Sequence, residues 1–285
     1  MAAGDPRYRE PFGSTLPGFT QIPVFDIEAV RRAVTHRTAA LLLETIPATL
    51  GMPPSPSGFM EAASDICTKN GALLILDEVQ TGLGRTGKLW GFQHYHVVPD
   101  IVVLGKGLSG GIYPISATVL RDDLADVFAD DPFLHISTFG GSELGCRVAS
   151  AVLATVSDPV FLAGVNERAG RIGEMLGRLK DRHGGYFKGA RQLGLMIGLE
   201  FGDPRDGLLV SRAAYANGLL MVYANNDSRV VQMLPPLNVP MELLPEIESR
   251  LDRTFRMARR LKPLAGAVLG RSSRRVPAAE DTTSP

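Results

Sequence analysis

Long hydrophobic runs are missing from this sequence. No apolar stretch approaches the roughly 18 residues that a membrane-spanning helix needs, and the first residues, Met1–Glu10, lack the apolar segment of a secretory signal peptide. An excess of either charge is missing too, since 30 Lys and Arg residues balance 30 Asp and Glu residues. The sequence therefore predicts neither a membrane protein nor a protein that binds nucleic acid or anionic membranes.

Cysteine is scarce, with two residues in the whole chain. Cys67 and Cys146 lie far apart in the sequence, and neither has metal-ligating residues beside it at the spacing of a metal site. We interpret both as buried thiols in a reducing compartment. This interpretation predicts a cytoplasmic location and no metal site.

The chain is long enough for one large domain or two modest ones, with 285 residues, 45% of them hydrophobic. Short apolar runs alternate with helical patterns in the first part, which predicts an α/β fold with a mostly parallel sheet. Beyond Gly184 the pattern changes to strands and one long amphipathic helix, which is typical of a smaller α+β domain. The predicted organisation is an N-terminal arm over 1–25, a large domain over 26–183, a small domain over 184–262 and a disordered tail over 263–285.

The most informative features are the ends of two apolar runs. Leu73–Leu76 has the length of a buried strand and ends at an Asp-Glu pair that begins at Asp77, before a glycine-broken loop. Ile101–Leu104 is a second such run, and it leads to Lys106 between two glycines. In open α/β sheets ligands bind beyond the carboxyl ends of the strands, so these side chains are placed where chemistry is expected.

An acid and a glycine-flanked lysine at successive strand ends suggest a site for pyridoxal phosphate (PLP). The lysine amine forms a Schiff base with this cofactor, and the acid keeps the pyridinium nitrogen protonated so that the ring accepts electrons. Each motif alone has a plainer interpretation. An Asp-Glu pair after a strand is most often a solvated turn or a helix cap, and Gly-Lys-Gly is most often a surface turn.

Longer motifs support the cofactor site. They are Asp77-Glu-Val-Gln-Thr-Gly-Leu-Gly-Arg-Thr-Gly87, Pro99-Asp-Ile101, Gly105-Lys-Gly107 and Thr138-Phe-Gly-Gly141. With these motifs the sequence resembles the class-III aminotransferases, the family of the ornithine, acetylornithine and 4-aminobutyrate aminotransferases. The resemblance extends from about Tyr8 to about Lys262. It implies the fold type I architecture of PLP-dependent transferases and a homodimer whose sites lie at the subunit interface.

The resemblance also implies a role for each site residue. Lys106 forms the Schiff base with PLP and moves the proton between substrate and cofactor, and Asp77 holds the pyridinium proton. Gln80 reaches the phenolic oxygen of the cofactor. Thr138 contacts the phosphate of the neighbouring subunit's cofactor, although a hydroxyl that caps a turn is the plainer alternative. The other charged residues of the longest motif, Glu78 and Arg85, are expected to be structural or to lie at the surface.

Two departures from the family pattern concern the substrate. After the first strand, which ends at Glu44, Thr49 stands where many members have a second acid. Gln232 stands where a family arginine grips the substrate carboxylate, and Arg229 is a candidate substitute. These changes put a substrate like ornithine or 4-aminobutyrate in doubt. They admit an amine without that carboxylate, an amino sugar or a polyketide-type carbonyl.

The N-terminal third of the family pattern has no counterpart in this sequence. By the resemblance, that part carries a glycine- and serine-rich loop for the cofactor phosphate and an aromatic residue that stacks on the cofactor ring. The leading prediction is a PLP-dependent aminotransferase that moves an amino group between an amine or amino acid and a 2-oxo acid through Lys106. The open alternatives are an incomplete fragment, half of a split enzyme that needs an N-terminal partner, and a PLP-dependent decarboxylase, racemase or aminomutase.

Overall fold

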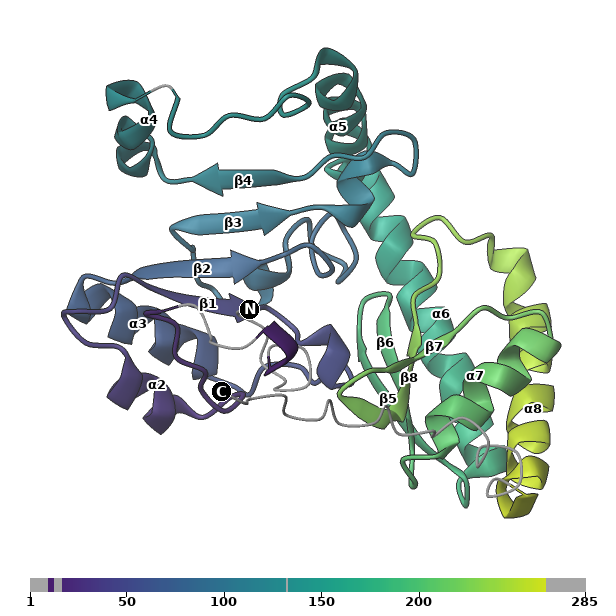
Figure 1. Cartoon of the computed structure of the whole chain (residues 1–285). Helices are drawn as coiled ribbons and strands as arrows, with labels where there is room; N and C mark the ends of the chain where they lie inside the picture. The colour runs from purple at the N-terminus through teal and green to yellow at the C-terminus, as the bar shows by residue number, and fades with distance from the viewer. Residues whose placement is uncertain (1–9, 13–16, 132, 265–285) are drawn as a thin grey trace, which may run out of the picture.

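The computed structural model describes residues 10–12, 17–131 and 133–264, and Figure 1 shows their arrangement. Two four-stranded sheets organise these residues, the first with the order β1-β2-β3-β4 and the second with the order β5-β6-β8-β7. The predicted tail beyond residue 264 and most of the predicted arm lie outside the described residues. The predicted domain boundaries stay a prediction.

The first sheet is mostly parallel, as predicted. β1 (Ala40–Glu44), β2 (Leu73–Asp77) and β3 (Ile101–Leu104) run parallel, and β4 (Ala117–Leu120) closes the sheet antiparallel to β3. This sheet belongs to residues 17–131 and 133–156, here called the first part. The helices of the first part are α2 (Ile27–Ala33), α3 (Phe59–Asn70), the short α4 (Asp126–Asp130) and α5 (Glu143–Val156). The sheet and its crossover helices form the α/β layer that the sequence pattern predicts.

Local signals explain where the helices of this layer begin and end. Asp26 caps α2, because its carboxylate accepts a hydrogen bond from the Ala29 amide at 2.9 Å. Gly71 ends α3 in the left-handed conformation, with φ at 69°, which only glycine adopts at little cost. The chain then enters β2 directly, so this cap determines where the strand begins.

The described helices cover one face of the first sheet. Leu41, Leu74 and Leu76 point to that face and are buried with α2 and α3, while Leu104 is buried with α5. Side chains alternate along a strand, so their neighbours point to the opposite face, where Leu42 is 57% exposed. Ile75, Ile101 and Val103 are half-buried on that opposite face. Within the described ranges, no helix joins them in a hydrophobic cluster.

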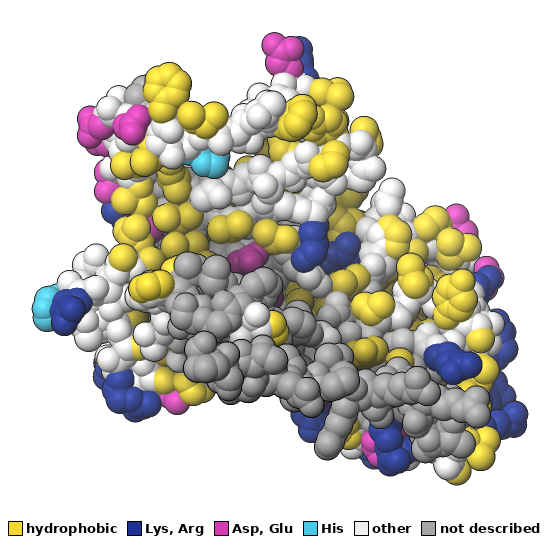
Figure 2. All heavy atoms as spheres, viewed as in Figure 1, with side chains coloured by type: hydrophobic (Ala, Val, Ile, Leu, Met, Phe, Trp, Pro, Cys, Tyr) yellow, Lys and Arg dark blue, Asp and Glu magenta, His cyan; other side chains and the backbone are white. Residues whose placement is uncertain are grey.

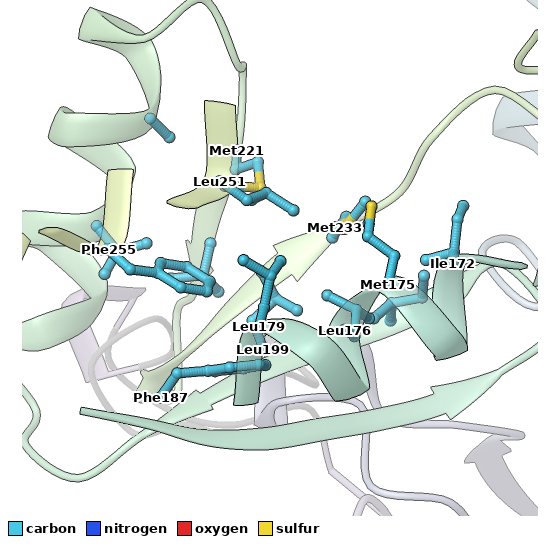
Figure 3. Close-up of a cluster of buried hydrophobic side chains, with 14 of the residues drawn as sticks. Ile172, Met175, Leu176, Leu179, Phe187, Leu199, Met221, Met233, Leu251 and Phe255 are labelled. Carbon is cyan, nitrogen blue, oxygen red and sulfur yellow. The ribbon is translucent and has the colours of Figure 1, made fainter. Parts of the chain in front are cut away.

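The second sheet is antiparallel throughout, and it holds the largest core. Its strands are β5 (Phe187–Leu193), β6 (Met196–Phe201), β7 (Val222–Ala224) and β8 (Asp227–Met233). Three helices, α6 (Pro159–His183), α7 (Asp206–Ala216) and α8 (Leu244–Leu261), cover one face. Figure 3 shows Leu179 of α6, Leu199 of β6 and Phe255 of α8 pointing into the same interior. All three are 0% exposed.

The second sheet and helices α6 to α8 lie in residues 159–264, here called the second part. Some details of the second part differ from the sequence-based expectation. The apolar residues from Leu193 to Phe201 predict a single strand, but a turn at Gly194 divides this stretch between β5 and β6. Neither β5 nor α7 was predicted. α6, which falls in the predicted large domain, packs its buried face against the second sheet.

The two cysteines also differ from each other. Cys67 is buried on α3, as predicted, and burial raises the pKa of its thiol to about 11. The prediction of a buried thiol at Cys146 is wrong, because this residue is exposed on α5. The helical pattern of α5 placed Cys146 in a helix, but it could not show which face of that helix would be covered.

Among the described residues, no single helix has the length and apolar composition to span a membrane. The bent pair α5 and α6 meets these two criteria only when taken together, with 67° between the helices. Val165, Ile172 and Leu179 of α6 are part of the second core.

Candidate functional site

The carboxyl ends of β1, β2 and β3 meet at one edge of the first sheet, because these strands are parallel. Glu44 and Asp77 are register partners at the ends of β1 and β2. Lys106 begins the short turn η4 (Lys106–Ser109) just after β3. In Figure 1 the three strand arrows point toward β6, β8 and α6. The predicted charged side chains therefore come together on the side of the first sheet that faces the second.

Lys106 has a specific geometry. Its backbone is left-handed with φ at 44°, a conformation that is uncommon for a residue with a side chain and occurs often at functional sites. Its Nζ atom donates a hydrogen bond to Gln80 Oε1 at 2.7 Å. This bond joins the loop after β2 to the turn after β3. Lys106 itself is exposed, so its amine is open to a ligand.

Two charged groups, Asp77 and Lys106, act on Glu44 at this edge. Asp77 is half-buried, and its Oδ1 atom accepts a hydrogen bond from the Val79 amide at 2.9 Å. Burial raises the pKa of Glu44, the Ala48 amide lowers it, the negative charge of Asp77 raises it further, and the positive charge of Lys106 lowers it. Both neighbours are thus close enough to change the ionisation of Glu44. The sequence interpretation noted Glu44 only as a strand end.

A pocket beside Lys106 is lined by both parts of the molecule. The first part contributes the loop after β2 and the turn after β3, and the second contributes β8 and the segment that follows it. The lining residues are Val79, Gln80, Gly82, Leu83, Arg85, Lys106, Gly107, Gln232, Leu234 and Leu237. Apart from Lys106 and Arg85, the lining carries no charged side chain among the residues described.

The predicted substrate residues take different positions. Gln232 lines the pocket, and its Nε2 atom donates to the Ala48 carbonyl at 3.2 Å. Thr49 lies in the adjoining turn η2 (Ala48–Leu50) and accepts a hydrogen bond from the Asn226 amide at 2.9 Å. Arg229 forms an ion pair with Asp227 at 2.8 Å. Neither Thr49 nor Arg229 belongs to the pocket lining, so their roles in substrate binding stay predictions.

Thr138 lies apart from this pocket. It is exposed on the segment between α4 and α5, and it belongs neither to the pocket lining nor to the hydrogen bonds of the described residues. Its predicted contact with a neighbouring subunit's cofactor stays a prediction.

Glu78 makes the structural hydrogen bonds that the sequence led us to expect. It is 1% exposed and accepts from the Gly91 amide at 2.7 Å, the Phe92 amide at 3.0 Å and the Thr45 hydroxyl. Burial raises its pKa, although these hydrogen bonds oppose the shift. Glu78 thereby fixes the loop that follows β2.

Comparison with known proteins identifies the family. The sequence model of the class-III aminotransferases matches residues 1–255. The chain belongs to the class-III aminotransferase family. An uncharacterized aminotransferase of Archaeoglobus fulgidus is 50% identical over 258 residues, which are 90% of this chain and 61% of that protein. An acetylornithine aminotransferase of Caldanaerobacter subterraneus is 41% identical over 88% of this chain and 62% of that protein.

Solved structures agree with this family and with its fold. The crystal structure of the ornithine aminotransferase from Toxoplasma gondii matches with a TM-score of 0.82 and 32% identity, over 90% of this chain and 60% of that one. The fold is therefore the fold type I of PLP-dependent aminotransferases. The chain spans about three-fifths of the length of these relatives, since it covers 61% of the A. fulgidus protein.

PLP is the cofactor of this family, and a second structure of the T. gondii enzyme is described with partial PLP occupancy at its active site. The residues at the strand ends fit this cofactor. Lys106 offers an exposed amine, and Gln80 lies within hydrogen-bond distance of that amine. Asp77 Oδ2 has no hydrogen-bond partner among the described residues, so it can accept a hydrogen bond from a ligand.

Proposed function

We propose that this chain carries the catalytic lysine of a PLP-dependent aminotransferase, which moves an amino group between an amine or amino acid and a 2-oxo acid. The observation that supports the proposal best is the contact of Lys106 Nζ with Gln80 Oε1 at 2.7 Å, at the strand end next to Asp77. The family supports the same activity, since the relatives named above are aminotransferases.

Each site residue then has a defined task. When bound, PLP supplies an electron sink that stabilises negative charge on the substrate carbon. Lys106 would hold the cofactor through its amine, and the same amine would serve as the base that holds and returns the substrate proton. The negative charge of Asp77 would retain a proton on the pyridine nitrogen. Gln80 would offer an uncharged amide to the phenolic oxygen.

The pocket supports a substrate that presents no carboxylate to Gln232. Leu83, Leu234 and Leu237 line it with apolar groups, and Gln232 adds an amide whose Nε2 atom is bonded to Ala48. A substrate carboxylate at this position would meet the uncharged amide of Gln232 instead of a cation. This arrangement supports the expectation, drawn from Thr49 and Gln232, that the substrate is unlike ornithine and 4-aminobutyrate.

We also propose a homodimer. Hydrophobic side chains are exposed over residues 112–144, here called the 112–144 surface, including Ile112, Val119, Phe133, Ile136, Phe139 and Leu144. Figure 2 shows hydrophobic side chains gathered in the region of β2 to β4 and α4. An exposed apolar area of this kind marks a protein interface more often than a free surface. The same segment carries Thr138, which in a dimer would reach the partner's cofactor.

A cytoplasmic location is part of the proposal as well. It is supported by two unpaired cysteines, Cys67 and Cys146, which are the chain's only cysteines.

The test is covalent trapping of the cofactor. The purified protein is incubated with PLP, reduced with borohydride and digested, and the modified peptide is identified by mass spectrometry. We expect the adduct on Lys106 and its loss in Lys106→Ala. Lys69→Ala is the matched control, because Lys69 lies on α3 and is not part of the pocket lining. An adduct that survives in Lys106→Ala would falsify the assignment.

A further inference from the structure

Arg85 occupies an unusual place in the loop after β2. It lines the pocket beside Lys106, yet its guanidinium group forms no ion pair with any carboxylate of the described chain. Instead its Nη1 atom donates to the Pro235 carbonyl at 2.6 Å and to the Leu195 carbonyl at 3.3 Å. Arg85 therefore bonds two backbone segments of the second part while it belongs to the first.

These bonds connect the two walls of the pocket. Pro235 lies between Leu234 and Leu237, which line the pocket from the second part. Leu83, two residues before Arg85, lines it from the first part. The short bond from Arg85 to Pro235 therefore sets the separation of the walls that face Lys106.

The junction around Arg85 is closely packed. The Leu195 amide donates back to the Arg85 carbonyl at 2.9 Å, and Asn166 Nδ2 donates to the Gly87 carbonyl at 2.9 Å. A Cβ atom at Gly194 would lie 2.3 Å from the carbonyl carbon of Thr86, so only glycine permits this approach. The loop after β2 is thus held against the β5–β6 turn by backbone contacts as well as by the guanidinium.

We propose that Arg85 is a positioning residue, which holds the second part of the chain at the distance that places the pocket wall opposite Lys106. The inference rests on the proposed function of Lys106. The bridge depends on the reach and planarity of the guanidinium, because the two N–H bonds of one terminal group, Nη1, reach two carbonyls that are separated in the sequence. A lysine at this position would keep the positive charge but would lack the planar group that directs these two N–H bonds.

Partial burial of Arg85 supports this role. Burial lowers the pKa of Arg85 to about 10, and the group remains charged at neutral pH. Two carbonyl dipoles then solvate a charge that water solvates poorly at this depth. If the two parts moved apart, the guanidinium and the two carbonyls would lose each other as hydrogen-bond partners. The contact therefore resists opening of the junction.

Arg191 offers a matched control. It also joins the two parts, since its Nη1 atom donates to the Gly51 carbonyl at 3.1 Å and its Nη2 atom bonds Glu200 at 2.8 Å. Unlike Arg85, it is not part of the pocket lining. A variant at Arg191 therefore weakens the same junction without touching the wall that faces Lys106.

The first readout needs neither cofactor nor activity. Hydrogen exchange measured by mass spectrometry in Arg85→Gln should rise severalfold in the segments 195–199 and 234–239, which contain the two carbonyl acceptors. Arg191→Gln should raise exchange near residues 48–52 and leave 234–239 unchanged. Equal exchange of 234–239 in Arg85→Gln and the parent protein would overturn the proposal, whatever the outcome of cofactor trapping.

The second readout is amino transfer by the PLP-loaded protein. Arg85→Gln should lower kcat between about tenfold and a hundredfold, the size of effect that a small misplacement of reacting groups produces, with a smaller change in KM. Arg85→Lys should recover less than half of this loss, because it restores the charge without the planar guanidinium that directs the two N–H bonds. Full recovery in Arg85→Lys, or an equal loss in Arg191→Gln, would contradict the positioning role. Should Arg85→Gln not fold, Arg85→Lys is measured in both readouts, with a smaller expected change.

Discussion

The two sheets differ in how completely the rest of the chain covers them. One face of the second sheet packs on α6, α7 and α8. On its other face, Met196 packs on Ala48 and Met52, which follow β1 in the first part. The first sheet has described helices on one face, and Leu42 on the other face is 57% exposed. The better-covered sheet contributes to the larger core, while the open sheet leaves its strand ends and part of one face exposed.

This difference separates stability from function within one chain. The second core contains the rings of Phe187, Phe201 and Phe255, packed 4.9 to 5.7 Å apart. The first sheet instead places Asp77 and Lys106 at an edge where burial is partial. Substitutions should therefore affect unfolding in one part and chemistry in the other, and four predictions test this division.

The largest expected effect is on the stability of the second core. Phe255→Ala removes a ring that is 0% exposed and should lower the free energy of unfolding by about 3–5 kcal/mol. Urea unfolding followed by circular dichroism measures it. Met257→Ala, on the same helix but 37% exposed, is the control and should cost far less. Similar losses in both variants would show that the core of the second sheet does not dominate stability.

The next effect is on chemistry at the first sheet. Asp77→Asn removes the charge that we propose holds the pyridine proton and should slow amino transfer by about a hundredfold, the effect of losing one electrostatic group in an active site. Steady-state rates with PLP measure it, and the unfolding midpoint should change little. Asp100→Asn is the control, because Asp100 lies at the amino end of β3 and accepts a hydrogen bond from the Leu74 amide at 2.8 Å. An activity loss only in Asp100→Asn would reverse the assignment.

A smaller effect is expected on association through the 112–144 surface. Phe139→Ser changes a residue that is 76% exposed, so the free energy of unfolding should stay within about 0.5 kcal/mol of the parent value. The dimer dissociation constant, measured by sedimentation, should rise about tenfold as apolar interface area is lost. Leu220→Ser is the control, because Leu220 is 86% exposed in the second part. A monomeric parent protein, or equal effects of both variants, would contradict the proposed interface.

The smallest effect is a pH dependence that comes from Glu78. Burial raises its folded-state pKa above the ordinary value of 4.5, so the folded protein holds a proton that the unfolded chain has lost. The resulting stability is present at pH 4.5 and below and is lost as pH rises through the folded-state pKa, by at most about 1.4 kcal/mol per pH unit. Glu78→Gln should remove this slope in urea unfolding at a series of pH values. An unchanged slope would assign the dependence to another group.

Much of the first part could be predicted from the sequence because its signals are local. The apolar runs before Asp77 and Lys106 became β2 and β3, and the Asn-Gly step at Gly71 became a helix end. The adjacency of Asp77 and Lys106 followed from the geometry of parallel strands. In each case the residues of a short segment were enough to explain its local structure.

The elements that were not predicted lack such signals. α7 begins at Asp206, next to Gly207. It is covered on several sides, since Leu209, Val210 and Ala213 are all 0% exposed. Its sequence therefore has no clear polar face. β5 is interrupted by a register shift near Gly189, which breaks the alternation that marks a strand. Both elements depend on the second core for their stability.

The sequence by itself determined the family, the order of the strands and helices around the site, and the identity of the lysine and the acid at the strand ends. These are properties of short segments, whose hydrophobic period and glycine positions do not depend on distant residues. Only the tertiary structure decided that Arg85 contacts Pro235 and Leu195, that Gln232 bonds Ala48, and that Cys146 is exposed. Each of these facts depends on which distant segment packs against a side chain or leaves it open, and that is settled only when the sheets and helices pack together.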